Sequence, residues 1–358
     1  MKQKTEGIKY AGSKSKLLPH ILEMANGLEG VNVVLDGFSG STRVSQAFAQ
    51  SAYSVVSNDV SVWSEVFATS YLQASNTNGY FQEILDHLNT LNGYDGWFSE
   101  HYGGDEEDIK KPFQRKNMRK LDAIRDEIER LELPWNEQCV LLTSLMLALD
   151  KVDSTLGHYA AYLSKWSKRS FSDLKLLLPK RFPLEKEHWV LRGDVFDAVK
   201  DRTFDLAYFD PPYGSNNEKM PPSRVRYASY YHFWTTVIKH DKPDIFGKAA
   251  RREDSRDDVS ASVFEDYKKN EDGYFFALGA LQKLIKETNA RYLMLSYSSG
   301  GRATKEQLTG IISECGKLTD VKKIDHKKNV MAGMRSTNKW LKDDDDKHYE
   351  YLFLMEKT

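Results

Sequence analysis

Residues 205–214 read DLAYFDPPYG, in which an apolar run is followed at once by an acid and two prolines. The apolar run Leu206–Phe209 is typical of a buried strand, and it stops at Asp210. The two prolines that follow cannot continue a central strand, because proline lacks an N–H and fixes φ. A carboxylate, a stiff turn and an aromatic ring therefore follow the carboxyl end of a strand. In open α/β sheets, this is the edge at which ligands bind.

The composition limits the class of protein. The 358 residues are 40% hydrophobic and 12% aromatic, which allows one large domain or two ordinary ones with a sizeable core. Because the net charge is only −1, a surface for nucleic acid has to come from local basic clusters. Cys139 and Cys315 give neither a disulfide framework nor the spacing of a zinc site. Without an apolar signal region or a membrane-spanning run, we expect a cytoplasmic protein with no metal and no membrane partner.

Two strands with functional ends are predicted upstream. Residues 31–50 read VNVVLDGFSGSTRVSQAFAQ, which predicts a strand over Val33–Leu35, a glycine-containing turn and a helix. Such a unit opens nucleotide-type crevices, but it matches neither GxGxxG nor a P-loop, so a phosphate cradle is not predicted. A second strand, Tyr53–Val56, leads to Asp59. That carboxylate is placed to hold the hydroxyls of a ribose, and the compatible alternative is that Asp59 or Ser61 caps the next helix.

The N-terminal residues 8–22, IKYAGSKSKLLPHIL, predict a short loop and then a helix from Leu17. Gly12 allows the backbone to approach a ligand closely, and Tyr10 and Lys14 lie on either side of it. The alternative is a loop that only caps the helix, with Lys14 in solvent.

Four later strands are predicted at Trp189–Leu191, Tyr292–Leu295, 318–328 and 349–355. The first leads to Asp194, whose carboxylate either lies near the base of a bound nucleoside or serves as a turn or N-cap residue. The strand at Tyr292–Leu295 leads into the polar turn 296–300 at the same edge of the sheet as DPPY.

The pattern changes between residues 75 and 186. Amphipathic spacing predicts helices over Tyr80–Leu91, Asn117–Leu131 and Trp135–Asp150, with Gly93–Asp108 as a loop. We interpret the whole segment as a helical insertion. Its second half is basic, and such cations contact phosphates while neighbouring aromatic rings stack on bases; a solvated helix face is the alternative. The candidate DNA contacts in this segment are Lys165, Lys168 and Arg169.

Two other segments are rich in basic residues. They are residues 219–256 and the connector between the last two strands. The aromatic cluster from Tyr230 to Trp234 in the first segment is predicted to be core rather than a platform for bases. The candidate DNA contacts in these segments are Arg224, Arg226, Arg251, Arg252, Lys327, Lys328 and Arg335.

The residues after the Leu206–Phe209 strand suit methylation of an exocyclic amine. Such an amine is a poor nucleophile, because its lone pair is delocalised into the ring. A carboxylate and a proline carbonyl can accept its two N–H groups and shift the nitrogen towards sp³ geometry, while a tyrosine ring stacks on the base. A base in a duplex must first be flipped out, at a cost of a few kcal/mol. Methylation at a cytosine carbon would need a cysteine after proline, and neither cysteine follows one. The candidate catalytic residues are Asp210, Pro211, Pro212 and Tyr213.

Together, these motifs resemble the adenine-specific DNA methyltransferases of the D12-like group, in which donor motifs precede the target-recognition region and DPPY follows it. IKYAGSKSKLLP resembles the N-terminal donor motif of the family and VLDGFSGS its DxFxGxG motif, with Thr42 where a last glycine is usual. NMRKLDAIRDEIERL and LALDKVDSTLGHYAAYLSKW resemble the helical region of a subgroup found in restriction–modification systems. The resemblance implies that S-adenosyl-L-methionine is the donor, bound by Tyr10, Lys14, Asp36, Phe38, Gly40, Ser41, Asp59, Asp194, Val195 and Asp210.

The resemblance implies an α/β fold with a Rossmann-like methyltransferase sheet of about seven strands, the last antiparallel. Residues 1–74 and 187–358 are the expected catalytic domain, and residues 75–186 are the expected target-recognition insertion. The expected reaction is methyl transfer to N6 of a flipped-out adenine in a specific sequence of double-stranded DNA. A restriction endonuclease that acts on the same site is the expected partner. The alternatives are an RNA adenine methyltransferase and an inactive DNA-binding relative, and the intact DPPY argues against the latter.

Overall fold

The chain forms two compact units, each assembled from several segments. The computed structural model describes residues 4–105, 107, 111–163, 165–214, 227–256, 259–325 and 349–358. The helix-rich unit comprises Met1–Lys16, Ser39–Arg192 and Tyr227–Ser260. The strand-rich unit comprises Leu17–Phe38, Gly193–Arg226 and Ala261–Thr358. Among the described residues, no helix combines the length and hydrophobicity that crossing a membrane requires.

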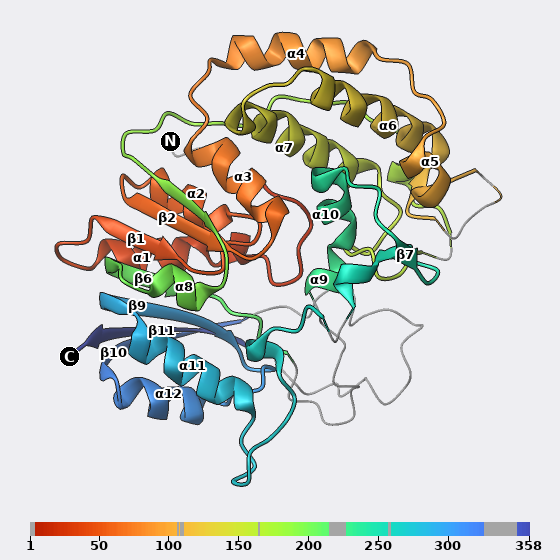
Figure 1. Cartoon of the computed structure of the whole chain (residues 1–358). Coiled ribbons are helices and arrows are strands. Elements are labelled where there is room, and N and C mark those ends of the chain that lie inside the picture. The colour runs from red at the N-terminus through yellow and green to blue at the C-terminus, as the bar shows by residue number, and fades with distance from the viewer. Residues whose placement is uncertain are drawn as a thin grey trace. The chain divides into compact units, whose positions relative to one another are not determined.

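A seven-stranded sheet has the strand order β10-β11-β9-β6-β1-β2-β5 (Figure 1). β6 pairs in parallel with β1 and β9, and β2 pairs in parallel with β5. β11 is antiparallel to both of its neighbours, so the prediction of about seven strands with the last one antiparallel is confirmed. The strands are Val33–Asp36 (β1), Ser54–Asp59 (β2), Trp189–Arg192 (β5), Thr203–Phe209 (β6), Asn289–Ser298 (β9), Gly316–Asp325 (β10) and Tyr349–Lys357 (β11).

The stretch DLAYF lies in β6, the central strand of the seven-stranded sheet, and Asp205 sets the register of the neighbouring β1. The side chains of β6 from Leu206 to Phe209 are buried. The carboxylate of Asp205 accepts the backbone N–H groups of Asn32 and Val33, both at 2.8 Å, which places Val34 opposite Leu206. Because β1, β6 and β9 are parallel, their carboxyl ends gather at one edge.

Helices cover the sheet of the strand-rich unit. α11 packs against α8 and α12, and α12 packs against β10. Thr304 and Gln307 form a capping box that begins α12. The helices are Leu18–Asn26 (α1), Val195–Val199 (α8), Phe276–Glu287 (α11) and Lys305–Ser313 (α12), with a 3₁₀ turn at Val263–Glu265 (η4).

In the helix-rich unit, α7 packs against α3, α4 and α6 (Figure 1). The three predicted helices of the insertion are confirmed as α4, α6 and α7, and the buried α10 confirms the predicted aromatic core. The helices are Arg43–Ala49 (α2), Val62–Leu72 (α3), Asn78–Thr90 (α4), Trp97–Tyr102 (α5), Arg115–Arg130 (α6), Trp135–Val152 (α7), Tyr227–Tyr230 (α9) and His232–Lys239 (α10). Shorter elements are Lys14–Lys16 (η1), Gly103–Gly104 (β3), Phe113–Gln114 (β4), Lys168–Phe171 (η2), Ile245–Phe246 (β7), Arg251–Arg252 (β8) and Glu253–Ser255 (η3).

Two predictions for the insertion need correction. The segment predicted as a loop contains α5, because the carboxylate of Asp122 on α6 accepts the N–H groups of Phe98 and Ser99 at 2.8 and 2.9 Å. Beyond α7, helical structure is limited to the short turn η2 among the described residues up to 186. In part of this stretch, side-chain amides accept backbone N–H groups that a helix would pair with its own carbonyls. Asn117, for example, accepts the N–H of Leu174 at 2.9 Å.

Candidate active site

The DPPY residues directly follow β6, as predicted. Asp210 and Tyr213 are half-buried. The carbonyl of Tyr213 accepts the N–H of Arg302 at 3.0 Å, and its ring centroid lies 5.4 Å from that of Tyr297. A Cβ atom added at Gly301 would come within 3.0 Å of the Cβ of Tyr213. The end of β9 and the turn after it therefore support Tyr213. The predicted turn 296–300 needs correction, because residues 296–298 still belong to β9.

The end of β1 lies at the same edge of the strand-rich unit. Asp36 is buried, and the N–H of Gly37 donates to the carbonyl of Tyr208 at 3.0 Å. A side chain at Gly37 would clash with Phe209, because its Cβ would lie 2.6 Å from that ring. The ring of Phe38 packs edge-on against Phe209. The glycine thus lets the predicted donor turn lie directly against the strand that leads to DPPY.

Asp194 and Val195 begin α8. The exposed carboxylate of Asp194 accepts the N–H of Phe196 at 2.9 Å, so the N-cap alternative is confirmed. Val195 is buried beside Gly37. The structure therefore brings Val195 to the predicted donor turn, and the role of Asp194 beside a nucleoside stays a prediction.

Three predicted donor residues meet in the helix-rich unit. The carboxylate of Asp59 accepts the N–H of Gly40 at 2.9 Å and that of Ser61 at 2.8 Å. A Cβ added at Gly40, which has a φ of +48°, would lie 3.2 Å from the ring of Tyr10, so glycine lets the ring pack on the turn. Burial raises the pKa of Asp59, while the bonds to Ser61 and Gly40 lower it. A carboxylate held by backbone N–H groups, with an aromatic ring packed on the same turn, fits the ribose and the base of an adenosyl donor.

Thr42 occupies the position at which the DxFxGxG motif usually has its last glycine. Its φ is +57°, a left-handed conformation that glycine adopts freely and that costs other residues about 1–2 kcal/mol. Its hydroxyl accepts a hydrogen bond from Gln46 at 3.0 Å, and Gln46 also accepts the N–H of Glu6 at 3.0 Å. The turn therefore keeps its geometry, and the threonine adds a tie to the N-terminal segment.

Lys14 and Ser41 are both buried in the helix-rich unit. The ammonium of Lys14 donates to the carbonyl of Gly12 at 3.1 Å. The alternative in which Lys14 is solvated is therefore wrong. Ser41 lies beside Gly7, because a Cβ atom added at Gly7 would lie 3.0 Å from the Cβ of Ser41.

Sequence reasoning did not connect the aromatic residues that surround Tyr10 with the donor motif. The ring of Tyr231 stacks on Tyr10 with centroids 4.8 Å apart, and its hydroxyl accepts the N–H of Ala11 at 2.7 Å. Trp63 lies 5.5 Å from Tyr10. Because these partners are far apart in sequence, no local pattern could have identified them.

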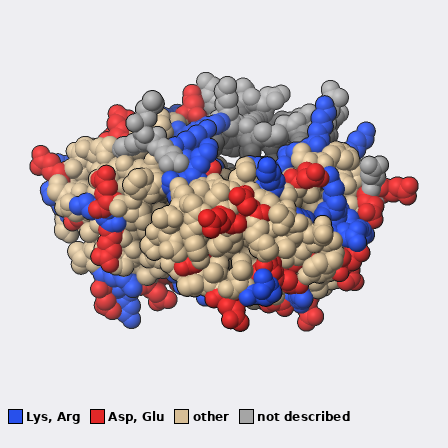
Figure 2. All heavy atoms as spheres, turned by 90° about the horizontal axis from the view of Figure 1, so that it is seen from above, with Lys and Arg blue, Asp and Glu red and all other residues tan. Residues whose placement is uncertain are grey.

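The predicted DNA contacts differ in their surroundings. Lys165 and Lys168 are exposed, whereas Arg251 donates to the hydroxyl of Ser229 at 2.6 Å. Basic and acidic side chains both occur on the described surface drawn in Figure 2. Arg169 donates to the carboxylate of Asp153 and to the carbonyl of Thr155, both at 2.8 Å, so these donors are directed at the protein. Five further candidates lie outside the described residues: Arg224, Arg226, Lys327, Lys328 and Arg335.

Arg252 needs correction as a predicted phosphate contact. Its side chain is only 4% exposed and forms bidentate bonds with Asp241, at 2.6 and 2.8 Å, and with Asp254, at 2.9 and 2.8 Å. These two carboxylates raise its pKa above the ordinary value despite its burial. With its donors directed at protein partners, Arg252 has a structural role.

Replacing Arg252 by methionine should change the stability of the protein, whereas replacing Lys168 by methionine should change the salt dependence of DNA binding. Loss of Arg252 leaves two carboxylates without their partner, so stability should fall by about 2 kcal/mol with no change in the salt dependence of DNA binding. Loss of the exposed Lys168 should leave the melting curve unchanged and reduce the slope of log K against log salt by about 1. Denaturant melts and fluorescence anisotropy across a salt series measure both. A reduced salt slope for the Arg252 variant would restore it as a DNA contact.

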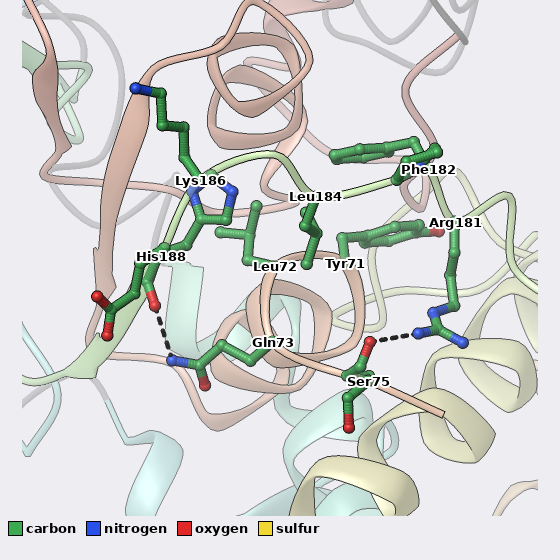
Figure 3. Close-up of a pocket in the computed structure, with 12 residues that line it drawn as sticks. Tyr71, Leu72, Gln73, Ser75, Arg181, Phe182, Leu184, Lys186 and His188 are labelled. Carbon is green, nitrogen blue, oxygen red and sulfur yellow. Dashed lines mark hydrogen bonds between the residues drawn. The ribbon is translucent and has the colours of Figure 1, made fainter. Parts of the chain in front are cut away.

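A pocket of about 590 Å³ lies where the end of α3 meets the segment before β5 (Figure 3). Arg181 donates to the carbonyls of Ala74 and, at 2.8 Å, Asn76, and Gln73 donates to the carbonyl of His188 at 3.2 Å. The polar groups drawn in Figure 3 thus tie two backbone segments together. None of the predicted site residues lines this pocket.

Comparison with known proteins agrees with this arrangement. Residues 10–298 match the family of the D12 class N6 adenine-specific DNA methyltransferases. The modification methylase StsI of Streptococcus sanguinis is 30% identical over 98% of the chain, which covers 52% of that relative. The type II methyltransferase M.NlaIII of Neisseria lactamica is 26% identical over 98% of the chain and 99% of its own length. M.FokI of Planomicrobium okeanokoites is 26% identical over 86% of the chain and 47% of its own length.

The chain thus spans about half the length of StsI and M.FokI, and nearly all of M.NlaIII. The family match begins at Tyr10 and ends at Ser298, so it includes the glycine turn after β1, Asp59, the predicted insertion and DPPY. The chain belongs to the family of D12 class N6 adenine-specific DNA methyltransferases.

Proposed function

We propose that the chain transfers a methyl group from S-adenosylmethionine to N6 of an adenine flipped out of duplex DNA, as the modification enzyme of a restriction–modification system. The observation that carries the proposal is a complete DPPY placed directly after the central strand of a family member. The names of its relatives support modification, since StsI is a modification methylase and M.NlaIII a type II methyltransferase. A restriction endonuclease for the same site is the proposed partner.

Asp210 and Pro211 would hold the amine that is methylated. The strand ends at Phe209, so the carboxylate of Asp210 and the carbonyl of Pro211 belong to a non-helical, non-strand turn. Both groups can accept N–H bonds from the adenine amine. Tyr213, held by Arg302 and Tyr297, would stack on the flipped base and return about 1–3 kcal/mol of the cost of flipping.

Tyr10, Gly40 and Asp59 would hold the donor. The backbone bonds from Gly40 and Ser61 fix the carboxylate of Asp59 in one orientation, in which it would accept the hydroxyls of a ribose. The ring of Tyr10 is positioned by Tyr231 and can pack against the adenosyl group. S-adenosylmethionine would supply the electrophilic methyl group on its sulfonium. The protein's contribution to the rate is then mainly orientation of the two reactants.

The test is incorporation of labelled methyl groups from the donor into unmethylated duplex DNA, with duplex RNA as a parallel substrate. We expect label in DNA, recovered as N6-methyladenine after hydrolysis. Label in RNA alone would support the RNA methyltransferase alternative. No label in either substrate, with donor still bound, would support the inactive DNA-binding relative. Mapping the protected adenines would then define the recognition sequence.

A further inference from the structure

Asp153, the residue that caps the C-terminus of α7, holds two cations from distant parts of the sequence. Its side chain is fully buried. The carboxylate oxygen Oδ1 accepts the ammonium of Lys9 at 2.6 Å and the Nε–H of Arg169 at 2.8 Å. The hydroxyl of Thr155 donates to Oδ2. One buried carboxylate thus joins the N-terminal donor motif to the loop that carries the predicted DNA contacts.

On the donor side, hydrogen bonds made by Lys9 and Ala11 fix the backbone immediately before and after Tyr10. The backbone N–H of Lys9 donates to the carboxylate of Asp150 at 3.0 Å, and its ammonium also reaches the carbonyl of Asp150. Ala11 is held by the hydroxyl of Tyr231. The position of the Tyr10 ring therefore depends on the anchoring of Lys9.

On the loop side, residues 165–169 are fixed to the same point. The carbonyl of Asp153 accepts the hydroxyl of Ser167 at 2.9 Å and the Nε–H of Arg169 at 2.8 Å. The hydroxyl of Ser154 accepts the N–H of Ser167 at 2.9 Å. Lys165 and Lys168 are exposed on this anchored loop.

Stability alone is a weak explanation for this cluster. Desolvation of charged groups offsets most of the attraction in a buried ion pair, and well-packed apolar residues often serve as well. The neighbouring carboxyl of Asp150 illustrates the cost, because burial raises its pKa to about 6 even though Lys9 lowers it. A costly charged cluster that joins two segments with ligand roles is better explained by positioning.

We propose that Asp153 is a positioning residue that couples DNA binding by the 165–169 loop to donor binding at Tyr10. The inference rests on the proposed function, in which Lys165 and Lys168 contact phosphates and Tyr10 contacts the donor. DNA bound to the loop would keep Arg169 bonded to Asp153. Because Lys9 bonds to the same carboxylate, its position would be fixed as well. The ordering cost of this network is then met once for both ligands, so each ligand tightens the binding of the other by the same factor.

The test measures the Kd of S-adenosylhomocysteine, an unreactive analogue of the donor, by calorimetry. Each protein is titrated with and without a saturating DNA duplex that the wild-type enzyme methylates. The wild type should bind the analogue at least about fivefold more tightly with DNA. Asp153→Asn should weaken binding without DNA and show a ratio near 1. Arg169→Gln should keep the wild-type affinity without DNA and also show a ratio near 1.

Asp173→Asn is the matched control, because Asp173 pairs with Lys116 at the surface, outside the cluster. It should keep the wild-type ratio. If Asp153→Asn does not fold, Arg169→Gln decides, because Arg169 is half-exposed and its loss leaves the Lys9–Asp153 pair in place. A methylating wild type with a ratio of 1, or an Arg169→Gln protein with the wild-type ratio, overturns the coupling. A wild type that binds the analogue but methylates no DNA overturns the proposed function instead.

Discussion

Replacing Asp210 by alanine is expected to reduce kcat by about 10³-fold or more and to change the Kd of the donor little. The alanine removes the acceptor that draws the adenine amine towards sp³ geometry, and loss of one transition-state hydrogen bond costs about 10²–10³ in rate. The strand before it should remain intact, because its packing comes from the buried residues Leu206–Phe209. Single-turnover methylation and calorimetry of the donor analogue measure the two effects separately.

Asp210→Asn is the matched control for that change. Asparagine keeps an oxygen acceptor of the same size, so its turnover should lie between those of the alanine variant and the wild type. Turnover close to wild type in the alanine variant would show that Asp210 is not the amine acceptor. A parallel loss of donor binding would instead point to a role in binding the donor.

Replacing Tyr213 by alanine is expected to reduce kcat/KM for DNA by about 10- to 100-fold. The ring would stack on the flipped adenine, and removal of one stacking ring costs about 1–3 kcal/mol. Flipping can be followed directly with 2-aminopurine in place of the target adenine, because its fluorescence rises when the base leaves the stack. The alanine variant should show a smaller rise at saturating protein.

Tyr213→Phe separates the ring from its hydroxyl. It keeps the stacking surface and the contact with Tyr297, so it should act almost as the wild type does. Melting curves are needed for both variants, because Tyr213 also packs beside Gly301. Equal losses in the phenylalanine and alanine variants, with unchanged melting, would assign the role to the hydroxyl and contradict stacking.

Local chemistry in the sequence was sufficient to predict the sheet and the motifs at its edge. Apolar runs that end in a charge, a glycine turn or a proline pair identified most strands of the seven-stranded sheet, because burial and the loss of backbone donors act within a few residues. The short strands β3, β4, β7 and β8 were not predicted. The same local rules placed DPPY after β6 and Asp59 at the end of β2. Helical periodicity likewise predicted α4, α6 and α7, whose apolar faces pack in the core.

Contacts between distant residues decided the rest. Arg252 has the sequence character of a DNA contact, but Asp241 and Asp254 enclose it. Asp122 caps α5 from a different helix. Asp153 binds Lys9 and Arg169, which lie on opposite sides of it in the chain. Charge and hydrogen-bonding groups can be read from a sequence, but their partners are chosen only when folding brings the segments together and excludes water. For this reason, the sequence identifies the cations and carboxylates. Only the three-dimensional packing decides which of them pair inside the protein and which stay on a surface that ligands can reach.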